Sequence, residues 1–353
     1  MPSSRVFFAI LFAVTAALAA RAAFADGCYV SPEDQDLYEP TQIGLIVHDA
    51  AASKEDLYLQ VDFQEASGAS IAKMGWILAL PSVPVVNEAD KALFVELMSM
   101  TRPYEDDDDF GAGCMDATAG GYLGDGDGEP NAVDVESRQV VGAFDVTTVA
   151  SDSVAPLESW IADRGFAVKD GTAEILQFYI DKGWHFVAVD VDLAQAAANG
   201  FLPPIELSFD SPRAVFPLRI SAINGLAATG SDTDEEYLDE EYTGVLLYAV
   251  ASRPLTVEGE GIEPEFAHSL DGADLTAYPA VDAALPSTGY LVKLRLDKTA
   301  IQMTDDLYLV PAANGASLAG SRRGGFDVAW LAIVAFVGAG AVLRLRRKAR
   351  SRG

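Results

Sequence analysis

The sequence predicts an α+β domain, built mostly of antiparallel sheet with a few packed helices, followed by one C-terminal transmembrane helix. Segments with strand-like patterns outnumber helical ones, and the helical segments lie between groups of strands. Half of the 353 residues are hydrophobic, which is enough to bury a sizeable core. Near the C-terminus, a charge-free apolar run extends far enough with its flanks to cross a bilayer.

The N-terminal residues 1–25 have the layout of a secretory signal peptide. Arg5 precedes an apolar run, and Ala23-Phe24-Ala25 forms an Ala-x-Ala cleavage pattern. The mature chain is therefore expected to begin at Asp26 and to continue as an extracytoplasmic domain over residues 26–311.

Residues 312–325 are expected to be a linker of small residues, and residues 326–345 the transmembrane helix, because a helix of that length spans about 30 Å. The arginine-rich residues 346–353 are expected in the cytoplasm under the positive-inside rule. This predicts a single-pass protein of the bacterial cytoplasmic membrane, with its N-terminal domain in the periplasm or at the cell surface. Gly324-Gly325 before the helix is also typical of a sorting signal that is cut off, and the sequence leaves both readings open.

Within the domain, the first helix is expected after Asn87, with its apolar stripe ending before Pro103. A second helix is expected between Ser153 and Gly165, and a third from Thr172 to Lys182. Alternating or continuous apolar runs predict strands at 42–47, 57–63, 74–80, 133–136, 139–141, 144–149, 184–191, 205–209, 214–220 and 245–250, and a hairpin-like pair at 290–296 and 307–310.

The chain is strongly acidic, with 53 Asp and Glu against 24 Lys and Arg and a formal net charge of −29. That charge repels nucleic acid and anionic lipid, so a nucleic-acid partner is not expected. Cations are the favoured partners, and a merely solvated acidic surface is the alternative. Much of the acidity lies in residues 104–131, which are predicted to form a long exposed loop.

Part of this loop follows the ligand spacing of a calcium-binding loop. Asp125, Asp127, Glu129 and Glu136 fall at ligand positions, but Pro130 stands where the sharp turn needs glycine. The sequence therefore predicts at most weak calcium binding, and calcium is the one cofactor it suggests.

Two cysteines, Cys28 and Cys114, lie in the part expected to be exported, where disulfides persist. They are expected to pair with each other. The three histidines, His48, His185 and His268, are isolated in sequence and are expected to have structural roles.

Several segments in order resemble a bacterial family of exported proteins known as domain of unknown function 2330 (DUF2330). The resemblance includes Cys28 just after the signal peptide, the strand at 42–47, and the motifs Gly75-Trp76-Ile77-Leu78-Ala79-Leu80-Pro81, Leu157-Glu158-Ser159-Trp160, Gly183-Trp184-His185-Phe186 and Phe216-Pro217-Leu218-Arg219. It implies export and a shared fold, and it brings no activity, cofactor or catalytic residue with it.

No nucleophile, metal cluster or phosphate-binding loop is recognisable, so the catalytic residues are unknown. The favoured function is a non-enzymatic binding or structural protein of the cell envelope, with an envelope protein as its possible partner. The alternative is an envelope hydrolase or transferase with an unrecognised carboxylate-based site, which a deep pocket holding two carboxyls of raised pKa would support.

Overall fold

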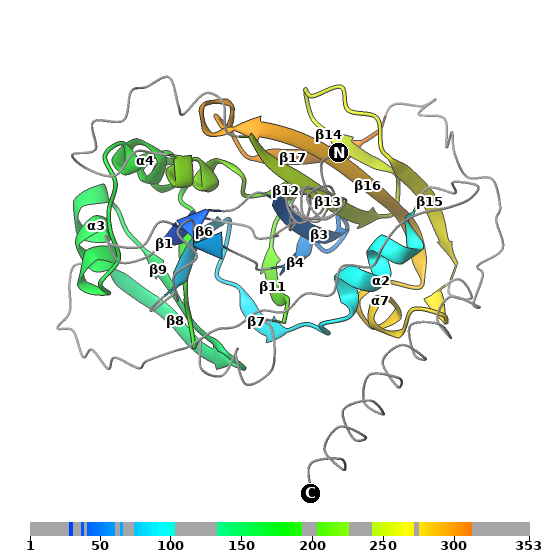
Figure 1. Cartoon of the computed structure of the whole chain (residues 1–353), viewed down its shortest axis with the longest axis horizontal. Helices are drawn as coiled ribbons and strands as arrows, with labels where there is room; N and C mark the ends of the chain where they lie inside the picture. Colours follow the sequence, from blue (N-terminus) through cyan, green and yellow to red (C-terminus); the bar gives the residue numbers. More distant parts are fainter. Residues whose placement is uncertain are drawn as a thin grey trace, which may run out of the picture.

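The computed structural model describes residues 28–30, 37–38, 41–60, 64–65, 74–102, 133–192, 203–225, 242–271 and 275–312. These residues form four sheets with short helices packed against the two largest (Figure 1). The architecture is therefore a layered one in which sheets supply most of the core.

The largest sheet has seven strands and is antiparallel apart from one pair. The parallel pair is β13 and β3, with Val245 opposite Gln42. In spatial order the strands are β15 (Phe266–Asp271), β16 (Thr288–Thr299), β13 (Tyr242–Ala251), β3 (Thr41–Asp49), β4 (Lys54–Gln60), β11 (Ile205–Asp210) and β7 (Val85–Glu88).

A second, fully antiparallel sheet has five strands, and helices α3 (Val154–Asp163) and α4 (Thr172–Lys182) lie beside it (Figure 1). Its strand β6 is buried along its whole length, since it reads Gly-Trp-Ile-Leu-Ala-Leu. The spatial order is β1 (Cys28–Val30), β6 (Gly75–Leu80), β10 (His185–Val191), β9 (Phe144–Ala150) and β8 (Asp134–Val141).

Two small sheets and two 3-10 helices also lie in the described part of the chain. A three-stranded sheet has the order β12 (Ala214–Phe216), β17 (Leu307–Pro311) and β14 (Leu255–Val257), and β2 (Leu37–Tyr38) pairs with β5 (Gln64–Glu65). Helix η2 (Arg219–Gly225) follows β12, and η4 (Ala300–Gln302) follows β16. The small sheet packs closely on β3: a Cβ added to Gly44 would lie 2.6 Å from the Phe216 ring.

Two groups of buried apolar side chains use the strands of the seven-stranded sheet. The larger group combines that sheet with the five-stranded sheet, helices α3 and α4, and the three-stranded sheet. The smaller group lies between the seven-stranded sheet and helices α2 (Leu93–Met100) and α7 (Pro279–Ala284). Glu96 of α2 ties these helices together, because its Oε2 accepts bonds of 2.8 and 3.1 Å from the backbone N–H groups of Ala280 and Val281.

One side chain joins the edges of the two large sheets. The Gln139 amide of β8 accepts a 3.1 Å bond from the backbone N–H of Val86 and donates a 3.0 Å bond to the carbonyl of Pro84. The amide thus provides hydrogen-bond partners for the Val86 N–H and the Pro84 carbonyl, which lie at the edge of the seven-stranded sheet.

The predicted fold class is wrong. The described residues are mostly β, and their helices are short and packed on the sheets. Strands β14 and β15 lie in a stretch for which no strand was predicted from the sequence. Within the described residues, no helix is long and apolar enough to cross a membrane. The span predicted at 326–345 lies outside those residues, as do residues 1–25 and 312–325 but for Ala312.

Many individual elements were predicted correctly. Helix α4 has the predicted bounds and ends at Gly183 in the left-handed region, with φ of 69°. The strands predicted at 290–296 and 307–310 exist as parts of β16 and β17, but they do not form a hairpin: β16 pairs with β13 and β15, while β17 pairs with β12 and β14.

Candidate functional site

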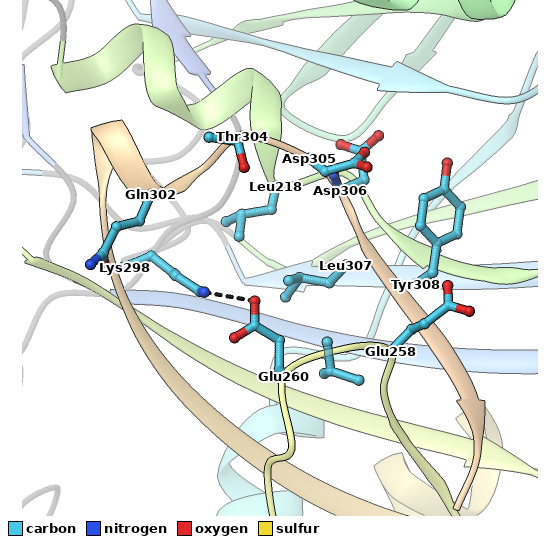
Figure 2. A pocket seen from close by; sticks show the side chains of 11 residues that line it. Leu218, Glu258, Glu260, Lys298, Gln302, Thr304, Asp305, Asp306, Leu307 and Tyr308 are labelled. Carbon is cyan, nitrogen blue, oxygen red and sulfur yellow. Dashed lines mark hydrogen bonds and ion pairs between the residues drawn. The ribbon is translucent and has the colours of Figure 1, made fainter.

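A small pocket lies where the three-stranded sheet meets the end of β16. Its volume is about 160 Å³. In Figure 2 its polar side chains surround Leu218 and Leu307. The lining residues are Leu218, Val257, Glu258, Glu260, Lys298, Gln302, Thr304, Asp305, Asp306, Leu307 and Tyr308.

Four carboxyl groups reach this pocket from two segments. Glu258 and Glu260 lie in the turn after β14, where Gly259 and Gly261 adopt φ of +78° and +63°. Both glycines accept this left-handed backbone without the steric cost that other residues bear. Asp305 and Asp306 come directly before β17.

All four of these carboxylates hold ion pairs, and Asp305 and Asp306 share Lys182 as their partner. Lys298 lies 2.7 Å from Glu260 (Figure 2), and Arg213 pairs with Glu258. The side chains of Glu258 and Asp305 are 55% and 62% exposed, so these two carboxylates face solvent at the mouth.

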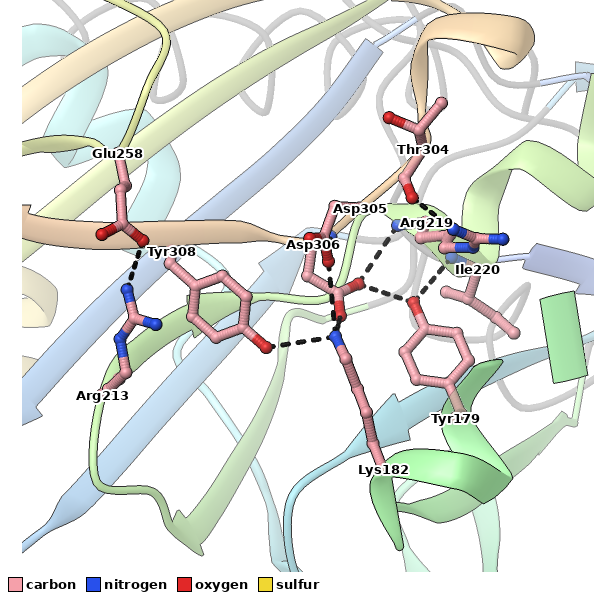
Figure 3. Close-up of polar contacts among 10 residues, drawn as sticks. All are labelled: Tyr179, Lys182, Arg213, Arg219, Ile220, Glu258, Thr304, Asp305, Asp306 and Tyr308. Atoms are coloured by element: carbon pink, nitrogen blue, oxygen red, sulfur yellow. Dashed lines mark hydrogen bonds and ion pairs between the residues drawn. The ribbon is translucent and has the colours of Figure 1, made fainter. Parts of the chain in front are cut away.

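Asp306, by contrast, is the centre of a buried hydrogen-bond network (Figure 3). Its carboxylate accepts bonds of 2.6 Å from the Tyr179 hydroxyl, 3.1 Å from Lys182 Nζ and 3.2 Å from the backbone N–H of Arg219. Burial raises the pKa of Asp306 above its usual value, and these three donors oppose the rise. The network joins α4, η2 and the start of β17.

Helix α4 places two of these groups on one face, because Tyr179 and Lys182 are three residues apart. Lys182 Nζ also lies 3.3 Å from Asp305 and 3.1 Å from the Tyr308 hydroxyl. Burial alone would lower the pKa of Lys182, but the Asp306 charge and the bonds to Tyr308 and Asp306 outweigh it and raise the pKa. Lys182 therefore stays charged at neutral pH.

A second carboxyl of raised pKa, Glu55 of β4, lies elsewhere in the core. It is fully buried, and its Oε2 accepts a 3.0 Å bond from the backbone N–H of Val215. Burial raises its pKa well above the usual value, opposed by the Val215 bond and assisted by the charge of Asp56. Glu55 does not line the pocket that holds Asp306, so the two carboxyls do not form one acid–base pair there.

The predicted calcium site falls largely outside the described residues. Asp125, Asp127 and Glu129 lie outside them, while Glu136 is in β8 and pairs with Nδ1 of His185 on β10. No group of three or more potential metal ligands occurs among the residues that the structure describes. Calcium binding by residues 104–131 stays a prediction.

The predicted disulfide cannot be traced either, since Cys28 begins β1 and Cys114 lies outside the described residues. His48 Nε2 lies 3.2 Å from the Ser211 carbonyl, and His268 is in β15.

The pocket itself was missed by sequence reasoning. Its residues come from separate segments, and the only local signals were the alternation Glu258-Gly259-Glu260-Gly261 and the pair Asp305-Asp306 before an apolar strand.

The chain is similar to solved structures and matches one family model. The crystal structure of baculovirus P35 is similar with a TM-score of 0.39 at 10% sequence identity, covering 81% of this chain and 100% of that one. No curated protein matches the chain. The family model described as "Uncharacterized protein conserved in bacteria (DUF2330)" matches residues 19–309, which confirms the resemblance seen in the sequence. The chain therefore belongs to the DUF2330 family of conserved bacterial proteins.

Proposed function

We propose that this chain is a non-enzymatic binding domain of the bacterial cell envelope, and that its pocket binds the cationic side chain of a protein partner. The observation that carries the proposal is the convergence of Glu258, Glu260, Asp305 and Asp306 on one pocket. Each pairs with a basic side chain of the same chain, but Glu258 and Asp305 keep more than half of their side-chain surface exposed to solvent. An arginine or lysine side chain offers the complementary charge and several N–H donors.

The charge of the whole chain favours the same class of partner. At −29, the protein attracts cations over distances of about one Debye length, roughly 8 Å at physiological salt, and this raises the rate of encounter with basic surfaces. The exposed carboxylates of Glu258 and Asp305 at the mouth would meet such a group first.

The pocket also limits the size of what it can hold. A volume of about 160 Å³ accommodates one side chain, not a drug-sized molecule. Leu218, Val257 and Leu307 offer apolar contact to the methylene stem of a long basic side chain. The envelope location rests on the signal-peptide pattern of residues 1–25.

Calorimetric titration of the full-length chain with short peptides would test the proposal. A peptide with one central arginine or lysine should bind, while matched peptides with citrulline or acetyl-lysine at that position should not. Asp305→Asn and Glu260→Gln should each weaken binding by about tenfold, the scale of a lost charge-assisted bond of about 1.4 kcal/mol.

The matched control is Asp152→Asn, which removes an exposed carboxylate just before α3 and should leave affinity unchanged. Equal binding of the charged and neutral peptides, or equal losses in all three variants, would contradict the proposal. Because charge drives the binding, affinity should also fall as salt is raised.

A further inference from the structure

The ammonium group of Lys182 lies among four aromatic side chains, Phe178, Tyr179, Trp184 and Tyr308, which are called the box below. Its Nζ is 3.9 Å from the ring centroid of Phe178, 4.8 Å from Trp184 and 5.4 Å from Tyr308, with Tyr179 at 5.9 Å. The distances to Phe178, Trp184 and Tyr179 are within the roughly 6 Å at which a ring face attracts a cation, whereas Tyr308 presents its hydroxyl edge, with Oη 3.1 Å from Nζ. Phe178, Tyr179 and Trp184 come from the end of α4 and the residues after it, whereas Tyr308 comes from β17.

Each of the three N–H donors of this ammonium has an acceptor. Asp306 Oδ2 lies at 3.1 Å, Tyr308 Oη at 3.1 Å and Asp305 Oδ1 at 3.3 Å (Figure 3). A primary ammonium has three donors and no acceptor, so the site matches that group in number, charge and shape.

Aromatic faces combined with carboxylates form the arrangement that recognises alkylammonium ligands. We infer that Phe178, Trp184, Tyr308, Asp305 and Asp306 form a binding site for a primary alkylammonium group, which Lys182 of the same chain occupies and keeps closed. The lysine is thus an internal ligand, and an external amine enters only when the lysine side chain is out of the box.

The geometry allows the lysine to leave without unfolding the helix. Lys182 is the last residue of α4, and its side chain is 25% exposed, so the box is open to solvent on one side. Gly183 follows it, and a Cβ built on that glycine would meet nothing within 4 Å. There is therefore open space beside the backbone at this point, while the bonds from the Gly183 and Trp184 N–H groups to the Ile180 and Tyr179 carbonyls, 2.9 and 3.0 Å long, keep the end of the helix in place.

The inference does not depend on the proposed function, although Asp305, Asp306 and Tyr308 belong to both the box and the pocket. It concerns the site that these three residues form together with the end of α4. A test on Lys182 therefore separates it from the binding of a partner's side chain.

The test uses full-length Lys182→Ala and n-propylammonium, which replaces the three methylenes and the amine that the substitution removes. Thermal unfolding is followed in 0–100 mM n-propylammonium chloride, with n-propanol and sodium chloride at equal concentrations as controls. The amine should raise the unfolding midpoint of Lys182→Ala by about 2–4 °C over both controls, because a ligand that binds only the folded state stabilises it. It should not raise that of the wild type, in which the box is filled.

Two further variants control the result. Lys182→Met fills the box with an uncharged chain of similar length and should not respond to the amine. Lys54→Ala removes an exposed lysine that pairs with Asp210 and should behave like the wild type. If Lys182→Ala is unfolded in buffer, the readout becomes its refolding yield from urea, which should rise with n-propylammonium and not with n-propanol.

No amine-specific stabilisation or refolding of Lys182→Ala would overturn the inference and leave Lys182 as a structural ion pair. An equal response in the wild type would overturn it as well, since the site would then be open. Failure of the peptide titration alone would count against the pocket proposal and leave this inference standing.

Discussion

Tyr179 and Asp306, 127 residues apart in the chain, share a buried hydrogen bond of 2.6 Å. The same hydroxyl accepts a 2.9 Å bond from the backbone N–H of Ile220, so one phenol oxygen satisfies both a buried carboxylate and a buried backbone donor. Removing that oxygen leaves two buried polar groups without this partner.

Tyr179→Phe should therefore lower the free energy of unfolding by about 2–3 kcal/mol, because hydrogen bonds to charged groups contribute more than neutral ones. Urea unfolding would measure the loss. Tyr290→Phe, which removes the hydroxyl of a half-buried tyrosine in β16, is the matched control and should change stability by less than about 0.5 kcal/mol. Equal losses of unfolding free energy in Tyr179→Phe and Tyr290→Phe would contradict a stabilising role for the buried hydrogen bonds of Tyr179.

Glu55 should make the protein less stable as pH rises. Its pKa is raised in the folded state, so the unfolded chain releases this proton first, from about pH 4.3 upward. Its contribution then falls by about 1.4 kcal/mol per pH unit until the folded pKa is reached. Glu55→Gln keeps an acceptor for Val215 without a titrating proton, so it should match the wild type near pH 4 and exceed it at pH 8.

Urea unfolding of both proteins between pH 4 and pH 9 would check this. Glu55→Leu is the informative companion, because it removes the carboxyl but leaves the Val215 N–H without its acceptor, at a cost of about 1–3 kcal/mol at every pH. A stability difference between wild type and Glu55→Gln that does not change with pH would refute the raised pKa.

Gly44→Ala should destabilise the protein by about 1–3 kcal/mol, because the new methyl group would lie 2.6 Å from the buried Phe216 ring. Gly183→Ala should also be destabilising, by about 1–2 kcal/mol, but through its left-handed backbone at φ of +69°. A double-mutant cycle separates the two causes. Phe216→Leu should relieve part of the Gly44→Ala loss and none of the Gly183→Ala loss.

Gln139→Leu should loosen the junction of the two large sheets. It removes the acceptor of the Val86 N–H and the donor to the Pro84 carbonyl, a loss of about 1–2 kcal/mol. Hydrogen exchange at Val86 should accelerate at the same time. Gln177→Leu removes an exposed amide that bonds only to Asp181 on its own helix among the bonds described for it, and it should leave both quantities nearly unchanged.

Local patterns in the sequence were sufficient where a single segment determines its own structure. The stripe of Ile175, Leu176 and Tyr179, followed by Gly183, predicted the whole of α4 because periodicity and the left-handed cap agree. The run from Gly75 to Leu80 likewise predicted β6, since a continuous apolar segment of that length suits a buried strand.

Prediction failed where pairing partners are distant. Residues 290–296 and 307–310 look like a hairpin because they are close in sequence, yet each pairs with strands that begin many residues earlier. Strand β15 was missed because Pro264 and Gly261 precede it and signal a loop. The contact of Asp306 with Tyr179 and Lys182 is likewise invisible in one sequence, since burial of an aspartate depends on what the rest of the chain brings to it.

The parallel pairing of β3 with β13 also determines when the molecule can fold. Strand β3 begins at Thr41, but its partner on that side is not made until Tyr242–Ala251 has been synthesised. Such long-range contacts lower the folding rate, because a long stretch of chain must be ordered before they form. Until then the apolar edge of β3 is open to pairing with other chains. Completion of the seven-stranded sheet is thus a late step, and a chain that ends before residue 242 would be prone to aggregate.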